Sequence, residues 1–301
     1  MPNLAKSPLA PVLGRHVPLR GPARLLFSSY ARTRYQPHQA ATRVTTSAGD
    51  VFDADLSSTL EWQLWAFGRY EPHFATLFRL LVGPGDRCVD VGANVGVHTV
   101  RLARLAGRDG EVIAVEPNPE VMARARRNVT LNKLANVRFV NAAASDLPGE
   151  MRLYCPGRSD TNRARASVLQ HAYLTGDEIT VPVVTVDELC GGSRVALIKI
   201  DVEGHEDAVV RGAARVIERD RPAVIFEYAP ELIGDAARSP EAWLAERGYV
   251  LFGLDAARQP VSGRVRLTLN RVRDRSPECG NILAVTSATA ARLEEVRGLC
   301  R

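Results

Sequence analysis

The sequence lacks long hydrophobic runs and any regular arrangement of cysteines. Its longest apolar stretches are only a handful of residues, such as residues 223–226, whereas a membrane-spanning helix needs about 20. The five cysteines form no CxxC pair and follow no regular spacing, so neither a zinc ribbon nor a disulfide framework is indicated. We therefore expect a protein without a membrane span, in a reducing, cytoplasmic setting.

Acidic residues are absent from the first 49 positions, which carry seven Lys and Arg side chains. The formal net charge of +5 therefore leaves 5 − 7, or −2, for the remaining residues. A body so close to neutral lacks the basic face of a dedicated nucleic-acid-binding protein. Because the first 49 residues also hold six prolines without a periodic pattern, we expect residues 1–49 to form a flexible basic N-terminal segment, with a transit peptide as the alternative.

The rest of the chain, residues 50–301, has the composition of one globular domain. Hydrophobic residues make up 46% of the sequence and charged residues 24%, which argues against a disordered or fibrous chain. Helical and strand-like patterns alternate along it, as is typical of parallel βαβ units. Helices are expected at about 60–81, 97–106, 121–131, 208–218 and 240–247. Strands are expected at 87–91, 111–115, 137–142, 196–200, 223–227, 249–254 and 282–286.

This order of elements predicts an α/β fold with a doubly wound, mostly parallel seven-stranded sheet of the Rossmann-like type. No obvious helix joins the last two strands, so the final strand could run antiparallel to the others. Residues 149–186 interrupt the alternation. We expect them to form a β-hairpin insertion with strands at 150–154 and 179–184.

A glycine-containing segment, Asp90-Val91-Gly92-Ala93-Asn94-Val95-Gly96, follows one predicted strand and opens a predicted helix. Glycines there allow a tight turn and close approach of a ligand to the backbone, and the helix N-terminus offers unpaired N–H groups. A dinucleotide-binding fingerprint would place glycine where Asn94 stands. The segment therefore indicates a small-molecule site and weakens a pyrophosphate interpretation.

Glu116 ends the next predicted strand, twenty positions after Gly96. A carboxylate at this place can accept hydrogen bonds from both hydroxyls of an adenosine ribose, as in enzymes that use NAD or S-adenosylmethionine. The two features together favour nucleoside binding. The alternative is that the glycines only form a tight turn and that Glu116 is a solvated strand end.

Three titratable residues, Asp201, Glu203 and His205, follow the predicted strand 196–200. In an open α/β sheet, ligands bind outside the carboxyl ends of the strands, so these side chains are candidates for the chemistry. Lys199 lies within the same apolar strand and needs a carboxylate partner, for which Asp201 and Glu227 are the candidates. Carboxylates of this group could also hold magnesium, but no spacing compels a metal site and we assign none.

Three strings of the sequence resemble FkbM-type methyltransferases. They are the segment 90–96 with the following Val97-His98-Thr99, the segment Ile198-Lys199-Ile200-Asp201-Val202-Glu203-Gly204-His205-Glu206, and Gly68-Arg69-Tyr70-Glu71-Pro72. The resemblance covers about residues 61–287. It implies the class I S-adenosylmethionine-dependent fold, with S-adenosylmethionine as cofactor. It also implies methyl transfer to a hydroxyl of a small-molecule acceptor, a sugar or natural-product scaffold.

The resemblance further implies roles for individual residues. Asp90, Gly92, Asn94 and Gly96 would line the methionine end and ribose of the cofactor, Glu116 would hold the ribose, and Asn141 and Ala143 would pass the adenine edge. A protonated hydroxyl is a poor nucleophile, so a general base is expected beside the methyl group. Asp201 and His205 are the candidates for that base, and Glu203 would orient the acceptor or the cofactor.

Two other functions remain open from the sequence. A nicotinamide-dependent oxidoreductase would share the ribose-binding carboxylate, but it should show the intact glycine fingerprint and leaves residues 201–206 unexplained. A non-catalytic nucleoside-binding module would bind the cofactor without needing Asp201 or His205.

Overall fold

The protein is described here by a computed structural model, which places residues 41–156, 166–168, 176–227, 239–258, 265–272, 280–296 and 299. Most of the predicted N-terminal segment, residues 1–40, lies outside the described residues. Among those that are described, no helix is long and apolar enough to cross a membrane.

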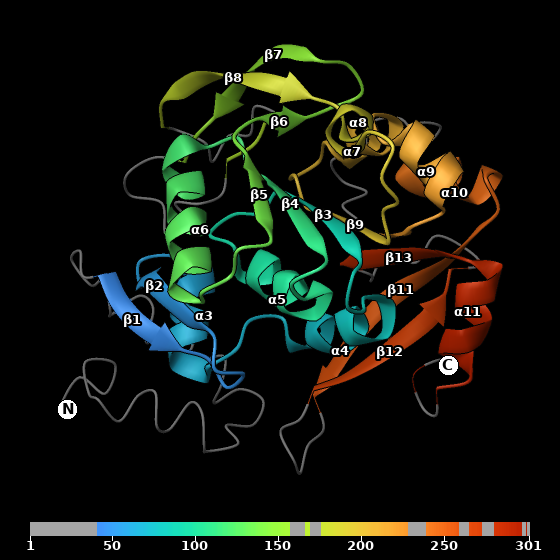
Figure 1. Cartoon of the computed structure of the whole chain (residues 1–301), viewed down its shortest axis with the longest axis horizontal. Helices are drawn as coiled ribbons and strands as arrows, with labels where there is room; N and C mark the ends of the chain where they lie inside the picture. Colours follow the sequence, from blue (N-terminus) through green and yellow to red (C-terminus); the bar gives the residue numbers. More distant parts are fainter. Residues whose placement is uncertain are drawn as a thin grey trace.

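A mixed sheet of eight strands forms the centre of the molecule, in the order β12-β11-β13-β10-β9-β3-β4-β5 (Figure 1). The strands are β3 (Arg87–Val91), β4 (Glu111–Val115), β5 (Val137–Val140), β9 (Leu197–Ile200), β10 (Ala223–Glu227), β11 (Tyr249–Arg258), β12 (Val265–Arg271) and β13 (Asn281–Thr286). The five strands from β5 to β10 are parallel, and β13 runs antiparallel to both β10 and β11. The predicted doubly wound α/β fold is confirmed, including the antiparallel final strand.

The strand count of seven was wrong, because β12 makes an eighth. β11 is longer than predicted and continues to Arg258, where it pairs with β12 as an antiparallel hairpin. Leu267 and Leu269 of β12 are buried and alternate with polar residues. Alternating apolar and polar residues are typical of a strand. The neighbouring arginines, however, are also typical of a solvated loop.

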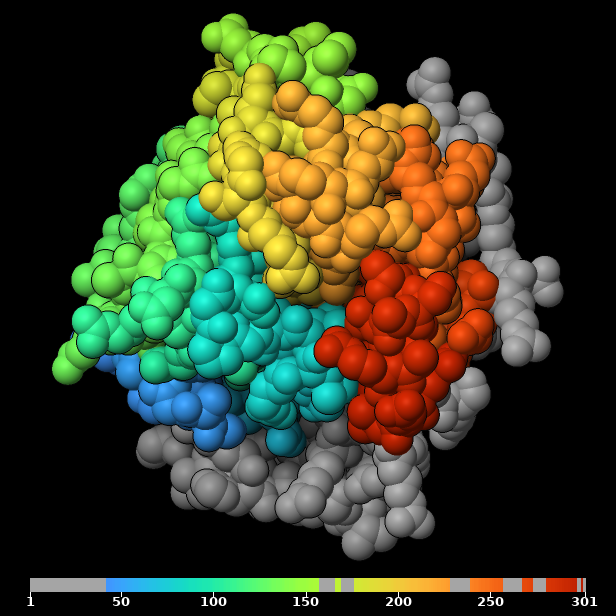
Figure 2. Space-filling model, turned by 45° about the vertical axis from the view of Figure 1, so that its right-hand side comes forward, coloured from blue at the N-terminus to red at the C-terminus, as the bar shows by residue number. Residues whose placement is uncertain are grey.

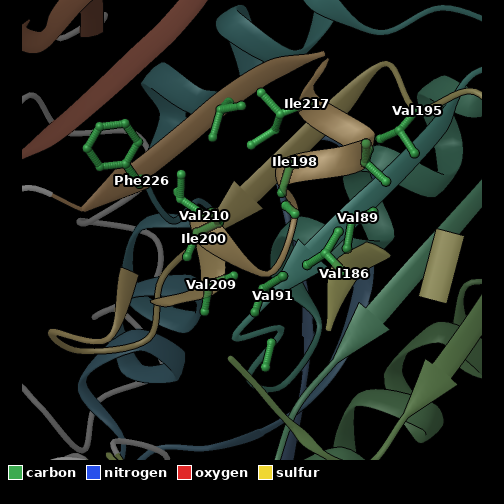
Figure 3. Close-up of a cluster of buried hydrophobic side chains, with 14 of the residues drawn as sticks. Val89, Val91, Val186, Val195, Ile198, Ile200, Val209, Val210, Ile217 and Phe226 are labelled. Carbon is green, nitrogen blue, oxygen red and sulfur yellow. The ribbon is translucent and has the colours of Figure 1, made fainter. Parts of the chain in front are cut away.

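Helices cover both faces of the sheet. They are α4 (Pro72–Leu81), α5 (Val97–Ala106), α6 (Pro119–Leu131), α7 (Val186–Cys190), α8 (Glu206–Arg211), α9 (Ala214–Asp220), α10 (Pro240–Glu246) and α11 (Ser287–Glu294). Figure 3 shows one apolar layer, in which strand residues such as Ile198 and Ile200 pack against Val209 and Ile217. In the second layer, residues of α4 and α5 pack against the C-terminal strands and α11, and the red C-terminal residues lie beside the cyan ones in Figure 2.

The helix predicted at 60–81 is two helices, α3 (Thr59–Phe67) and α4. Gly68 ends α3 in the left-handed region with φ of 65°, and Pro72 begins α4. A glycine just past a helix end and a proline at the first position of the next helix are both favoured there. Phe74, Leu77 and Phe78 form a buried apolar face of α4.

The hairpin insertion forms as predicted. β7 (Gly149–Tyr154) and β8 (Glu178–Val184) pair antiparallel, and the short β6 (Ala143–Ala144) joins β8 in parallel. This three-stranded sheet lies at the top of Figure 1 and has its own apolar side, which includes Leu153 and Val181. Most of the loop between β7 and β8 lies outside the described residues.

A β-hairpin of β1 (Ala41–Thr45) and β2 (Val51–Asp55) lies against α6. Its first strand falls within the segment that the sequence led us to expect as flexible. Side-chain amides of α6 pair with the edge of β2: Asn132 exchanges two hydrogen bonds with the backbone of Val51, and Asn128 accepts one from the N–H of Asp53. Asn128 also donates to the carbonyl of Val95, at 2.8 Å. The hairpin is thus connected to the glycine-containing turn.

Candidate active site

A cavity of about 230 Å³ opens at the carboxyl ends of β3, β4, β9 and β10. This volume is several times that of one water molecule, roughly 30 Å³ in the liquid, so the cavity is large enough for a small organic molecule. It lies where the chain order reverses, since β3 leads outward to β4 and β5 on one side and β9 leads to β10 on the other. Open α/β sheets bind their ligands at such a point.

The glycine-containing turn forms one wall of the cavity through Gly92 and Asn94. Gly92 has φ of 75°, and a Cβ atom there would lie 1.9 Å from the carbonyl oxygen of Asp201. Only glycine can bring the two backbone segments so close. Asn94 has φ of 52°, in the left-handed region that asparagine tolerates better than most residues, and its Oδ1 accepts a hydrogen bond from the N–H of Val95.

Glu116 lies directly against this turn and lines the same cavity, with 5% of its surface exposed. One carboxylate oxygen accepts from the N–H of Asn94 at 3.0 Å, and the other accepts from the N–H of Asn118 at 2.9 Å. Burial raises the pKa of Glu116 from its ordinary 4.5 to about 7, although the two N–H donors oppose the shift. The carboxylate is therefore held in one orientation, with lone pairs left to accept from a ligand.

Three of the residues proposed for the cofactor are not among those that line the cavity. Asp90 is fully buried, accepts a 2.6 Å hydrogen bond from Thr99 and lies 3.6 Å from the ammonium of Lys199. Gly96 begins α5 with φ of 86° and faces α6. The amide of Asn141 donates to the carbonyls of Glu116 and Pro117. The contacts of Asp90, Gly96 and Asn141 in the structure are with other groups of the protein, and their contact with a ligand stays a prediction.

The cavity has an apolar wall near Glu116. It consists of Ala142, Ala143 and Ala144, together with Leu153 of the insertion. Ala143 was proposed for the adenine edge, and its small side chain keeps this wall flat. Ala142 lies within the predicted span 141–143, whereas Ala144 and Leu153 were not predicted, because strands of an insertion give no sequence signal of which core element they will face.

Asp201, Glu203 and His205 all line the same cavity, as their common position after one strand predicts. Their loop is fixed by Glu206, whose buried carboxylate accepts from the N–H groups of Val202 and Gly204 at 3.1 and 3.2 Å. Glu203 itself has φ of 56°. Two backbone N–H groups on one carboxylate hold this short loop in a conformation that a non-glycine residue rarely adopts alone.

Lys199 lies below the acidic loop and is 2% exposed. Its ammonium is 3.2 Å from Asp201, one of the two predicted partners, and 3.6 Å from Asp90, which was not predicted. Burial alone would lower the pKa of Lys199, but Asp201, Asp90 and Glu71 together raise it above its ordinary value. Lys199, which also lines the cavity, is therefore a cation that neutralises part of the negative charge there.

His205 places its Nε2 atom 2.9 Å from the hydroxyl of Ser145. Burial lowers the pKa of His205 below its ordinary 6.5, while the nearby carboxylates of Asp146 and Asp207 act in the opposite direction. The imidazole is therefore neutral at pH 7 and able to accept a proton.

A further part of the site comes from the segment between α3 and α4, whose residues Tyr70 and Glu71 line the cavity. Glu71 lies 2.9 Å from Nε2 of His98, which also lines it. Burial, and then the charges of Glu71 and Asp201, raise the pKa of Tyr70 above its ordinary value, so its hydroxyl stays protonated. The strings containing these residues were part of the family resemblance, but no spacing argument assigned them to the cavity.

Two buried carboxyls of the site, Glu116 and Glu206, make the stability depend on pH. Burial raises the pKa of Glu206 to about 7, as for Glu116. A folded-state pKa above the ordinary 4.5 contributes stability that is present below pH 4.5 and is lost as the pH rises through about 7. We therefore expect these two carboxyls to add to the free energy of unfolding as the pH falls from 7 to 5, while the lowered pKa of His205 acts in the opposite direction. Urea denaturation of the wild-type protein and of Glu206→Gln isolates the contribution of Glu206.

Glu206→Gln should remove part of this pH dependence, since the glutamine oxygen can still accept from both N–H groups but carries no charge. The matched control is Glu246→Gln, which removes an exposed carboxylate of α10. Equal pH dependence in the wild-type protein and Glu206→Gln would show that this carboxyl ionises normally in the folded protein.

The positions of the described side chains bear on whether these carboxylates could hold a metal ion. Among residues 41–156 and the later described segments, no three His, Cys, Asp or Glu side chains group in a way that could hold a metal ion. The carboxylates of Asp201 and Glu203 lie on the cavity beside Lys199 instead.

The segment that carries this site matches a known family. A family model described as the methyltransferase FkbM domain matches residues 90–251, more than half of the chain, including the glycine-containing turn, Glu116 and the acidic loop. The chain belongs to the FkbM methyltransferase family. The resemblance found in the sequence is thereby confirmed.

Individual proteins with known names resemble this FkbM domain at low sequence identity. "Methyltransferase 1" of Beauveria bassiana (strain ARSEF 2860) is 27% identical over 146 residues, which cover 41% of this chain and 57% of that protein. Hexuronic acid methyltransferase AglP of Haloferax volcanii is 27% identical over 135 residues, covering 43% and 50%. The chain thus spans about half the length of these curated relatives. A solved methyltransferase FkbM from Methylobacillus flagellatus KT is 14% identical, with a TM-score of 0.42 over 77% of this chain and 56% of that one.

Proposed function

We propose that this FkbM domain transfers a methyl group from S-adenosylmethionine to a hydroxyl of a sugar or natural-product scaffold. One observation carries the proposal: Glu116 touches the glycine-containing turn, and both line the same cavity as Asp201, Glu203 and His205. A carboxylate that can bind a nucleoside and a candidate general base therefore border the same cavity. The similarity to a hexuronic acid methyltransferase agrees with a sugar-like acceptor.

The cavity fits the adenosyl part of the cofactor. Glu116 offers two fixed carboxylate oxygens that can accept from the ribose hydroxyls. The alanines 142–144 and Leu153 offer a flat apolar surface for the adenine ring. Glu71, at the other end, can bind the ammonium of the methionine part.

The cofactor supplies a methyl group that is already activated by the positively charged sulfur to which it is bonded. The protein therefore contributes mainly by aligning the acceptor oxygen with that methyl group, an effect worth about 7–11 kcal/mol in well-oriented reactions. The carboxylates that line the cavity, among them Asp201 and Glu203, favour binding of the positively charged methyl donor over binding of a neutral molecule. In this proposal Glu203 would orient the acceptor or the cofactor.

His205 is the better of the two candidate bases. The carboxylate of Asp201 is already engaged by Lys199 at 3.2 Å, whereas the imidazole of His205 is neutral and borders the cavity. In the proposed step His205 takes the hydroxyl proton, the acceptor oxygen forms a bond to the methyl carbon, and the carbon–sulfur bond breaks. Its electron pair returns to sulfur, which becomes a neutral thioether. A positioned base of this kind contributes about 10²–10⁴-fold to the rate.

Titration calorimetry with S-adenosylmethionine and with NAD tests the binding half of this proposal. We expect binding of the methyl donor and none of NAD, because the turn lacks the second glycine that lets a pyrophosphate approach the backbone. Incubation with hydroxylated sugars and natural products, followed by mass spectrometry, should then reveal one added methyl group. Binding of NAD without any response to S-adenosylmethionine would favour the oxidoreductase alternative.

A non-catalytic nucleoside-binding module is distinguished by the same assays. It would bind the methyl donor and transfer nothing to any acceptor in the panel. Turnover that depends on His205 or Asp201 would contradict that alternative.

A further inference from the structure

We infer that Ser145 and Asp146 form a hydrogen-bonded relay that fixes the tautomer of His205, with the proton on Nε2 and a bare Nδ1 directed to the cavity. This inference rests on the proposed role of His205 as the base. Ser145 and Asp146 are positioning residues, since they act on the imidazole and touch no substrate.

The direction of the relay follows from counting protons. The hydroxyl of Ser145 lies 3.1 Å from a carboxylate oxygen of Asp146, to which it donates, and 2.9 Å from Nε2 of His205. A serine hydroxyl has one proton to donate and lone pairs with which to accept. Because the ionised carboxylate of Asp146 can only accept, Ser145 must accept from the imidazole. Nε2 of His205 therefore carries a hydrogen.

Ser145 is held in place by contacts that have no connection with the imidazole. It is 6% exposed, and its N–H donates to the carbonyl of Val184 in β8 at 3.0 Å. Its own carbonyl lies against the end of α8, where a Cβ on Gly212 would come within 1.9 Å of the oxygen. The insertion sheet and the end of α8 thus fix Ser145 on both sides, so the ring of His205 is oriented by a rigid partner.

The cavity lies on the other side of the ring. His205 lines the cavity and Ser145 does not, so Nε2 points away from the ligand space. No hydrogen bond to Nδ1 occurs among the residues that the structure describes. Nδ1 is then the nitrogen that can take a proton from an acceptor hydroxyl, and the relay keeps its lone pair bare in the neutral ring.

Charged groups around His205 include Asp146, which follows β6, and Asp207 of α8, which is ion-paired with Arg211 at 2.9 Å. Asp201 and Glu203 precede His205 in its own loop. Asp146 and Asp207 both raise the pKa of His205 through their charge, against the larger effect of burial. Of these two, only Asp146 is hydrogen-bonded to Ser145. The pair therefore offers a matched comparison between a charge effect and the relay.

Nitrogen-15 NMR of histidine-labelled protein tests the tautomer directly, because a protonated and a bare ring nitrogen have well separated shifts. The signals of His205, identified among the six histidines by their loss in His205→Asn, should show a protonated Nε2 and a bare Nδ1. In Asp146→Ala the serine proton is released toward Nε2, so we expect the bare Nδ1 signal to move toward the protonated range. Asp207→Asn should leave the tautomer unchanged. A protonated Nδ1 in the wild-type protein would overturn the inference.

The pH profile of kcat/KM provides the second readout. Asp146 is exposed, so Asp146→Ala should fold normally. We expect its kcat/KM to fall by about tenfold, a part of the 10²–10⁴-fold contribution of a positioned base, with the acidic limb moved to lower pH. Asp207→Asn should move that limb in the same direction without the tenfold loss. If kcat/KM fell equally in both variants, the loss would be explained by the removed charge alone, and this result would overturn the relay.

The two proposals can fail separately. The expected tautomer in a protein that methylates no acceptor would support the relay and contradict the proposed function. Methyl transfer in a protein whose His205 carries its proton on Nδ1 would support the proposed function and overturn the relay.

Discussion

Replacing Glu116 with alanine is expected to weaken binding of S-adenosylmethionine by about 100-fold, equivalent to about 2.7 kcal/mol. The substitution removes two acceptors for the ribose hydroxyls, and hydrogen bonds to a charged group contribute about 1.5–3 kcal/mol each. It also leaves the N–H groups of Asn94 and Asn118 without the carboxylate that now accepts from them. Titration calorimetry measures the dissociation constant.

Glu120→Ala is the matched control, because it removes a carboxylate only four residues away that is exposed on the first turn of α6. Its affinity for the methyl donor should stay within about twofold of the wild-type value, as for surface substitutions away from a site. Equal affinity in Glu116→Ala and the wild-type protein would place the ribose elsewhere and contradict the proposed orientation of the cofactor.

Replacing His205 with asparagine is expected to lower kcat by about 10²–10⁴-fold, the contribution of a positioned general base. The affinity for S-adenosylmethionine should change little, because Glu116 and the glycine-containing turn, which are proposed to hold the donor, are unaltered. Single-turnover methyl transfer to an identified acceptor, together with calorimetry for the donor, separates the two effects.

The other candidate base makes this experiment decisive. Asp201→Asn leaves an isosteric group beside Lys199 but removes a negative charge from the cavity. If His205 is the base, Asp201→Asn should weaken donor binding more than it slows the chemical step. A large loss of kcat in Asp201→Asn, with His205→Asn close to wild type, would assign the proton transfer to Asp201.

Much of the fold could be predicted because the central strands are buried on both faces and appear as short apolar runs between helical patterns. All four residues of β9 are buried, including Lys199. The sequence indicated that this lysine needs a carboxylate but did not indicate Asp90. That contact depends on the pairing of β9 with β3, where Lys199 lies opposite Asp90. Strands a hundred residues apart give no local signal of such pairing.

The parts that were missed had weaker local patterns. The break between α3 and α4 was signalled by Gly68 and Pro72, but the apolar periodicity on either side concealed it. For the site, the position of Glu116 after its strand predicted its place on the cavity, since the ends of parallel strands share one edge of a sheet. The contact of Ser145 with His205 could not be predicted, because it depends on how the insertion packs against α8.

The contact between Gly92 and Asp201 has a consequence for attempts to redesign this domain. No side chain separates the turn proposed for the methyl donor from the loop proposed for the acceptor, so a backbone shift on one side displaces the other. Changing acceptor preference by remodelling residues 201–205 would therefore disturb donor affinity as well. The insertion sheet reaches the cavity through Leu153, in the wall proposed for the adenine ring, so substitutions there are expected to change donor affinity too.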